Sequence, residues 1–260
     1  MRCEQVIQIL ENLSPLSFAA GWDNCGLQTG RKVKEINSIY IALDPTDEVI
    51  TEAVERKADM LLTHHPLIFS PLKKVSQEDY TGRRIMRLIQ NDICYYAMHT
   101  NFDVMGMADA AAYEMELRHR QVLSTTYEDD IAKEGFGRFG KLPQIMTLRE
   151  CAEYVKKKFG IASVKVFGDL ETVLETAAIS PGSGKSMIQP ALEAGVDVLI
   201  TGDIDHHEGI DSIARGLQII DAGHYGLEQI FVPYMEEYLH REMQGVSIFM
   251  HRQESPFVII

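Results

Sequence analysis

Short runs of apolar, often β-branched residues alternate along the chain with stretches in which apolar residues recur every three or four positions. The short runs predict buried strands at residues 38–44, 59–65, 93–103, 163–169, 176–180, 196–203 and 217–224. The longer stretches predict helices at residues 48–58, 81–92, 147–160, 186–195, 211–216 and 226–243. Such alternation is typical of an α/β fold with mainly parallel strands.

The order of these predicted elements is similar in the two halves of the chain. Five residues of the first half recur at one constant offset, as Ala53/Ala191, Glu55/Glu193, Asp59/Asp197, Leu61/Leu199 and Thr63/Thr201. The spacing Ala97-x-His99-x-x-x-Asp103 is also followed by Ala222-x-His224-x-x-x-Glu228. We therefore expect two related α/β lobes, over residues 1–125 and 126–260.

The stretch AISPGSGKS (178–186) contains half of a phosphate-binding loop. The full pattern needs a glycine five positions before Gly184, where this chain has Ile179, a β-branched residue without the backbone freedom of glycine. This stretch joins a predicted strand to a predicted helix, and the equivalent junction in the first half, residues 44–47, is acidic. Phosphate binding therefore does not explain why the chain has a junction at this place. We set aside a P-loop nucleotidase and interpret the stretch as a turn at the carboxyl end of a strand, with a local phosphate contact left open.

The composition limits the classes of partner. A formal charge of −13 and a sequence pI near 5.1 argue against nucleic acid, which is bound through Lys and Arg. Four separated cysteines form no CxxC pair, which favours a reducing cytoplasm over a disulfide framework. The N-terminal residues follow helical spacing without the apolar run of a secretory signal, and no segment is apolar enough for a membrane span. We expect a cytoplasmic protein with no membrane partner.

Six of the nine histidines lie at predicted strand ends or just beyond, namely His64, His65, His99, His206, His207 and His224. Adjacent histidines at a strand end, followed by Pro66, can turn toward two points of one cleft and hold two metal ions. A hydrogen-bonded structural pair is about equally compatible with this placement. The three other histidines, His119, His240 and His251, lie in polar surroundings and are expected at the surface.

Two further histidines are each followed by a carboxylate four residues later, as His99/Asp103 and His224/Glu228. Such residues share a face if a helix begins there, although each pair alone favours a structural hydrogen bond over metal ligation. Together with the adjacent histidines, they favour an open, catalytic metal site at one sheet edge. The donors are imidazoles and carboxylates without cysteine, which suits Zn, Mn, Fe, Ni or Co.

Two other features have structural interpretations. Arg138, in the glycine-rich stretch GFGRFGKLP (135–143), is expected to be a solvated turn residue. Trp22, between Gly21 and Asp23, is expected in a tight turn with its indole packed under the site.

Four ordered motifs resemble one known family: GWDNCGLQTG (21–30), THHPLIF (63–69), HTNFD (99–103) and TGDIDHH…IDAGHYGLE (201–228). Together they are similar to the GTP cyclohydrolase I type 2 homologue family, also called NIF-three-like, in its compact form without an inserted middle domain. The resemblance runs nearly end to end. The sequence departs from the family's usual pattern at VMGMAD (104–109), where Asp109 is kept.

The resemblance implies a dinuclear metal site in the cleft between the two lobes. His65 and Asp103 would hold one divalent ion, His64 and His224 the other, and Glu228 would bridge them. His99 would then support a ligand or serve as the catalytic acid/base. The resemblance also implies a toroidal homohexamer with the metal sites facing an internal cavity.

These features leave two functions open. The first is a metal-dependent hydrolase with two ions per chain, acting on GTP or a related small molecule, since two metals activate water and orient a substrate. The second is a metal-binding or regulatory toroidal assembly without enzymatic activity. Five protein ligands for two ions leave coordination positions vacant, which favours the enzyme.

Overall fold

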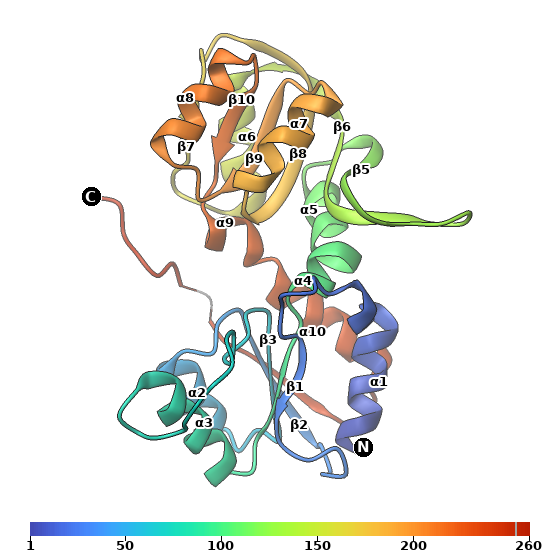
Figure 1. The fold of residues 1–260 in the computed structure, drawn as a ribbon, viewed down its shortest axis with the longest axis vertical. Coiled ribbons are helices and arrows are strands. Elements are labelled where there is room, and N and C mark those ends of the chain that lie inside the picture. Colours follow the sequence, from blue (N-terminus) through green and yellow to red (C-terminus); the bar gives the residue numbers. More distant parts are fainter. Residues whose placement is uncertain (253) are drawn as a thin grey trace. The chain divides into compact units, whose positions relative to one another are not determined.

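The computed structural model describes residues 1–252 and 254–260. Its helices and strands form two compact units, Met1–Phe102 with Phe231–Glu254 and Asp103–Ile230 with Ser255–Ile260. Each unit contains one β-sheet covered by helices, so the expected α/β class is confirmed (Figure 1). None of the described helices is long and apolar enough to cross a membrane.

The sheet of the first unit has five strands in the order β1-β4-β3-β2-β11. All its pairings are parallel except that of β1 with β4. Its strands are β1 (Gly26–Thr29), β2 (Ser38–Ala42), β3 (Met60–Thr63), β4 (Cys94–Ala97) and β11 (Ser247–Met250). Because β2, β3 and β4 run in parallel, their carboxyl ends meet at one edge of the sheet.

Helices cover both faces of this sheet (Figure 1). Buried side chains of α2 and α3 pack on the face that carries Tyr40, Leu61 and Tyr95. Two of the helices begin at residues that cap them, since Thr46 accepts a hydrogen bond from the amide of Val49 and Asp79 from that of Gly82. The helices are α1 (Cys3–Leu13), η1 (Leu16–Phe18), α2 (Asp47–Glu55), α3 (Tyr80–Gln90), α4 (Thr100–Phe102) and α10 (Phe231–Glu242).

The sheet of the second unit has six strands in the order β5-β6-β8-β9-β10-β7. Only β8–β9 and β9–β10 are parallel, so the expectation of a mainly parallel sheet is wrong for this unit. The β5–β6 hairpin carries the antiparallel part, and β5 is mostly exposed, so it lacks the apolar alternation that predicts a strand. The strands are β5 (Arg118–Glu128), β6 (Lys133–Thr147), β7 (Lys165–Phe167), β8 (Val173–Ser183), β9 (Val198–Gly202) and β10 (Gln218–Asp221).

The helices of the second unit pack on both faces of its sheet. Residues of α5 and α6 join one apolar cluster with Ile179 and Ile200, and residues of α7 join another with Leu199. The single helix expected over 226–243 is interrupted after Glu228, which places α9 and α10 in different units. The helices are η2, a π-helix (Asp103–Met107), α5 (Ala108–Glu114), α6 (Leu148–Phe159), η3 (Lys185–Met187), α7 (Ile188–Ala194), α8 (His206–Ala214) and α9 (His224–Glu228).

Both units contain a β-α-β segment in the same register, as the recurring residues predict. β2 and β3 flank α2, and β8 and β9 flank α7. The strand partners Ile39–Met60 and Tyr40–Leu61 correspond position by position to Ala177–Val198 and Ala178–Leu199. The two lobes are therefore related in structure.

A repeated aspartate fixes this register in each unit. Asp59 Oδ2 accepts hydrogen bonds from the amide and hydroxyl of Ser38, at the start of the neighbouring strand. Asp197 Oδ2 accepts from the amide and hydroxyl of Thr176 in the same way. Because one carboxylate oxygen binds several donors, a shift of either strand would leave it without them.

The two units divide the chain differently from the expected halves, 1–125 and 126–260. The chain enters the second unit at Asp103 and returns to the first at Phe231. The reason is the pairing of β11 with β2, which makes a C-terminal strand part of the N-terminal sheet. The sequence patterns predict no strand at residues 247–250, and they do not indicate this pairing.

Two side chains expected at the surface are largely buried. Arg138 is only 4% exposed, and its guanidinium makes a two-point contact with Asp109 at 2.8 Å and a further ion pair with Glu134 at 3.0 Å. His251 hydrogen bonds to Glu52 Oε2 at 3.1 Å and lies 3.3 Å from the Tyr40 hydroxyl. Both were misplaced because decisive partners, Asp109 for Arg138 and Glu52 for His251, lie far away in the sequence.

We predict that Arg138→Ala lowers the free energy of unfolding of the second unit by about 2–4 kcal/mol, because two carboxylates and several carbonyls lose their donor. Urea unfolding followed by circular dichroism measures this. Arg149→Ala is the control, since Arg149 forms only an exposed pair with Glu171 and should cost less than about 0.5 kcal/mol. Equal losses in the two variants would contradict the structural role of Arg138.

Candidate metal-binding residues

His64 and His65 follow β3 directly, and hydrogen bonds fix the backbone of the turn that carries them. The amide of His65 donates to the carbonyl of Leu43 at 3.0 Å. The hydroxyls of Thr63 and Tyr95 both donate to the carbonyl of His65, at 2.7 and 2.8 Å. Burial raises the pKa of Tyr95, so its phenol keeps the proton that it donates. The pair of imidazoles therefore projects from a rigid turn.

Each imidazole at this sheet edge has its Nδ1 beside an oxygen acceptor. His64 Nδ1 lies 2.7 Å from the carbonyl of Met98, and His65 Nδ1 lies 2.7 Å from Asp44 Oδ1. His99 Nδ1 lies 2.9 Å from Asp23 Oδ1. A carbonyl or carboxylate can only accept, which assigns the proton to Nδ1 and, in a neutral ring, the lone pair to Nε2. This is the arrangement of histidines that bind metal through Nε2.

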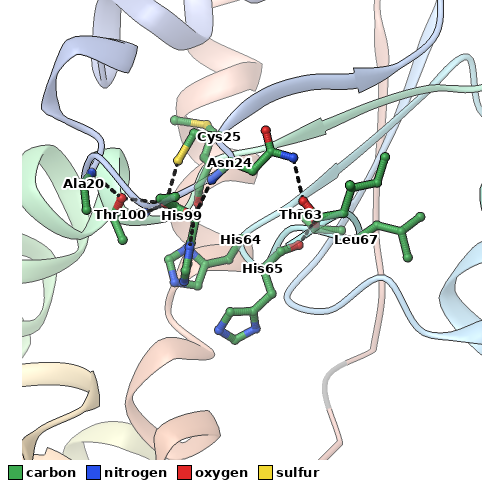
Figure 2. Close-up of polar contacts among 12 residues, drawn as sticks. Ala20, Asn24, Cys25, Thr63, His64, His65, Leu67, His99 and Thr100 are labelled. Carbon is green, nitrogen blue, oxygen red and sulfur yellow. Dashed lines mark hydrogen bonds and ion pairs between the residues drawn. The ribbon is translucent and has the colours of Figure 1, made fainter. Parts of the chain in front are cut away.

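The three rings lie close together, and all three belong to the first unit. Their centroids are 4.9 Å apart for His64 and His65, 5.3 Å for His64 and His99, and 5.6 Å for His65 and His99. One potential ligand nitrogen from each lies within 4.8 Å of the other two. Figure 2 shows the three side chains side by side. The structure thus brings together the histidines from β3 and from the segment after β4, as expected for one sheet edge.

Asp23 organises the segment that carries His99. Its Oδ1 accepts from His99, and its Oδ2 accepts from the Thr100 amide at 3.0 Å and from the Thr100 hydroxyl at 2.5 Å. Burial alone would raise the pKa of Asp23, but hydrogen bonds from His99, Cys25 and Thr100 lower it well below its usual range. A permanently charged, buried carboxylate therefore orients the His99 ring.

Cys25 lies beside this network without being a candidate ligand. Its Sγ donates to Asp23 Oδ2 at 2.9 Å (Figure 2). Burial raises the pKa of the thiol to about 11, and Cys25 belongs to none of the groups of possible metal ligands among the described residues. The donor set at this edge remains nitrogen and oxygen, as the sequence predicts.

In the second unit, His224 and Glu228 both lie on α9. His224 Nδ1 lies 2.7 Å from Asp203 Oδ2, and its Nε2 lies 3.0 Å from Glu228 Oε2. The two residues share a face of one helical turn, as their spacing predicts. His224 thus has the same Nδ1 partnership as the histidines of the first unit. Asp103, the other expected ligand, is the first residue of this unit and begins the π-helix η2.

Asp221, at the end of β10, holds the two backbone segments that carry Asp203 and His224. Its Oδ2 accepts from the amide of Ile204 at 3.1 Å and its Oδ1 from that of Gly223 at 3.0 Å. Lys165 completes the arrangement with an ion pair to Asp221 at 2.6 Å. Because the accepted amides are next to Asp203 and His224, Asp221 fixes the distance between those two side chains.

The glycines of AISPGSGKS have a packing explanation rather than a phosphate-binding one. A Cβ on Gly182, whose φ is +80°, would lie 2.6 Å from Glu228 Oε1, and a Cβ on Gly184 would overlap the Thr201 side chain. Lys185 forms ion pairs with Glu208 and Asp205 instead of pointing at an anion site. These contacts explain the glycines and Lys185 without a bound phosphate.

Sequence reasoning missed the oxygen partners of the imidazoles, namely Asp23, Asp44, Asp203 and the carbonyl of Met98. Three of them are aspartates at strand ends or in quoted motifs, so polar residues at strand ends were the available signal. Trp22 was misplaced: it lies in the expected turn, but it is 65% exposed rather than packed under the site.

A model of the Duf34/NIF3 (NGG1p interacting factor 3) family matches residues 1–256. The chain belongs to the Duf34/NIF3 family. A relative from Clostridium perfringens, named GTP cyclohydrolase 1 type 2 homolog, is 34% identical over 100% of both chains. A protein of the same name from Streptococcus pneumoniae is 35% identical over 95% of this chain and 94% of its own.

Solved structures of similar proteins share the fold. A Bacillus cereus protein related to NIF3 superimposes with a TM-score of 0.91 at 25% identity, over 100% of this chain and 99% of its own. Reduced HcgD from Methanocaldococcus jannaschii gives a TM-score of 0.83 at 31% identity, over 96% and 97%. The family resemblance inferred from the four motifs is therefore confirmed.

We predict that Gly184→Ala lowers the free energy of unfolding by about 1–3 kcal/mol, because the added methyl group overlaps Thr201. Lys185→Ala should change the free energy of unfolding by less than about 0.5 kcal/mol, because the Lys185 side chain is exposed in its ion pairs. Lys185→Ala should also leave the affinity for GTP, measured by calorimetry, unchanged. A marked loss of GTP affinity in this variant would restore the P-loop interpretation.

Proposed function

We propose that this Duf34/NIF3 protein is a metal-dependent hydrolase in which His64, His65, Asp103, His224 and Glu228 hold two divalent cations. His65 and Asp103 would bind one ion, His64 and His224 the other, and the Glu228 carboxylate would bridge the two. The observation that carries the proposal is the Nδ1–H···O hydrogen bond of each imidazole, because it prepares Nε2 for a metal.

The chemistry of the donors supports divalent transition metals. Imidazole nitrogens and carboxylate oxygens suit Zn, Fe, Mn, Ni or Co. His64 and Glu228 are buried, and a buried carboxylate is stabilised by a bound cation. When bound, two such ions lower the pKa of water and polarise a substrate oxygen or carbonyl.

His99 is the residue that we propose to move protons. Its Nδ1 is held by the charged carboxylate of Asp23, so Nε2 is the atom left to accept or donate a proton. The Asp23 carboxylate would stabilise the imidazolium that forms. This pairing distinguishes His99 from His65, whose partner Asp44 is half exposed.

The substrate that we propose is GTP or a related small molecule, in line with the names of the curated relatives. We also propose that the protein assembles as a homohexamer and binds no other macromolecule. The alternative is a metal-binding or regulatory assembly without catalysis. Turnover of a substrate by metal-loaded protein separates the two, because an assembly would bind metal without turnover.

We predict that purified protein, reconstituted with Zn²⁺, Mn²⁺ or Co²⁺, binds about two ions per chain by elemental analysis. Glu228→Gln should lose bound metal, because the neutral amide cannot bridge two cations. Glu171→Gln, on the surface, is the control and should bind as the wild type does. Absence of bound metal in the wild type after reconstitution would refute the ligand assignment.

We predict that Asp203→Asn weakens Zn²⁺ binding about 10- to 100-fold, because His224 loses the carboxylate that orients its ring. Competition with a chromophoric chelator measures the affinity. Asp205→Asn is the matched control, since Asp205 caps α8 and asparagine caps equally well. If both variants keep wild-type affinity, Asp203 does not support a metal ligand.

A further inference from the structure

Two aromatic side chains lie exposed beside the imidazoles of the first unit. Trp22 is 65% exposed and Phe69 is 54% exposed. Their ring centroids are 5.9 Å apart, with the planes inclined at 55°. Two large rings in water lack the stabilisation that burial provides. Their exposure therefore indicates a surface that binds another molecule. We refer to Trp22 and Phe69 together as the aromatic wall.

Hydrogen bonds hold the two halves of the aromatic wall together. The side chain of Asn24 donates to the carbonyl of Ile68 at 2.6 Å. The amide of Ile68 donates to Gln28 Oε1 at 2.8 Å. The residues next to Trp22 are thereby tied to the residue before Phe69. The wall is a fixed surface, and a ligand that stacks on it loses little free energy in ordering it.

The aromatic wall adjoins His99 directly. The His99 ring centroid lies 6.2 Å from that of Trp22 and 6.4 Å from that of Phe69, and both contacts are close to perpendicular. His99 in turn contacts His64 and His65. A flat molecule stacked on the wall would therefore lie beside the nitrogen donors of this sheet edge.

We propose that the aromatic wall binds the planar heteroaromatic ring of the substrate, such as a nucleobase, by stacking. The inference rests on the proposed function. It narrows the substrate from a small molecule to a small molecule that carries a planar ring. Aromatic side chains stack on any base, since every base has a π-face. Because the two rings are inclined, one of them can stack on the face of the bound ring while the other contacts its edge.

A second copy of the chain is the competing occupant. Leu72 and Val75 are also exposed, in the loop after Phe69, and exposed apolar side chains are common at protein interfaces. The small ring is favoured because the wall contacts His99, which in turn contacts His64 and His65, so a ligand on the wall would lie within reach of their nitrogen donors. The following experiment distinguishes the two occupants.

The chain has one tryptophan, so intrinsic indole fluorescence reports on Trp22 alone. Full-length protein, metal-free and Zn²⁺-loaded, is titrated with GMP, AMP, CMP and UMP, with correction for absorption by the bases. Saturable quenching by at least one nucleotide, and none by ribose 5-phosphate, is expected. Phe69→Leu should weaken the quenching nucleotide's binding about tenfold or more, because stacking on one ring is lost. Phe257→Leu, at 59% exposure the matched control, should not.

The outcomes separate this inference from the proposed function. If the protein binds no metal but its fluorescence is quenched, the quenching supports stacking on the aromatic wall. The absence of bound metal then refutes the metal assignment. Metal binding without quenching by any of the four nucleotides would overturn the proposal that the aromatic wall binds a planar ring. Light scattering on the same samples tests the competing occupant: a smaller assembly for Phe69→Leu, together with no quenching, would identify the surface as a contact between copies.

Discussion

The hydrogen bond from an imidazole Nδ1–H to an oxygen is the interaction on which the candidate site depends. It occurs at His64, His65, His99 and His224, and in each case the acceptor comes from another segment of the same unit. The bond fixes both the tautomer and the ring orientation. An imidazole without it would present either nitrogen and rotate freely, and would lose much of its value as a ligand or proton carrier. The hydrogen bonds of Tyr95 and Asp221 serve the same end, since they fix the backbone segments that carry His65 and His224.

One β-α-β frame is used twice, with different side chains at equivalent places. At the constant sequence offset of the repeat, Asp44 corresponds to Gly182 and His65 to Asp203, in a part of β8 whose register against β9 shifts after Ile179. The first unit thus carries a carboxylate that orients a histidine on the adjacent strand end. In the second unit the glycine makes room for Glu228, and Asp203 becomes the orienting carboxylate for His224. The two units share the register of their central strands and differ in the side chains at the strand ends.

This redistribution explains why the glycine-rich stretch resembles a phosphate loop without having its geometry. Gly182 and Gly184 are needed because a Cβ would meet Glu228 and Thr201, which are fixed by the packing of α9 and β9. Glycine is required both where a backbone approaches a ligand and where it approaches another side chain. The pattern alone cannot tell these two requirements apart, and the neighbouring side chains decide between them.

The apolar periodicity determined the central strands, most helices and the related β-α-β segments, because these depend on burial of side chains at fixed spacing. Four motifs determined the family, and the i, i+4 spacing placed His224 and Glu228 on one face of α9. Tertiary structure alone decided the β5–β6 hairpin, the return of β11 to the first sheet and the burial of Arg138. It also decided the oxygen partner of each imidazole and the exposure of Trp22. The hairpin joins neighbouring strands and was missed because its exposed strand β5 lacks apolar alternation. The other features depend on the surroundings that the fold creates from residues distant in sequence, about which local spacing carries no information.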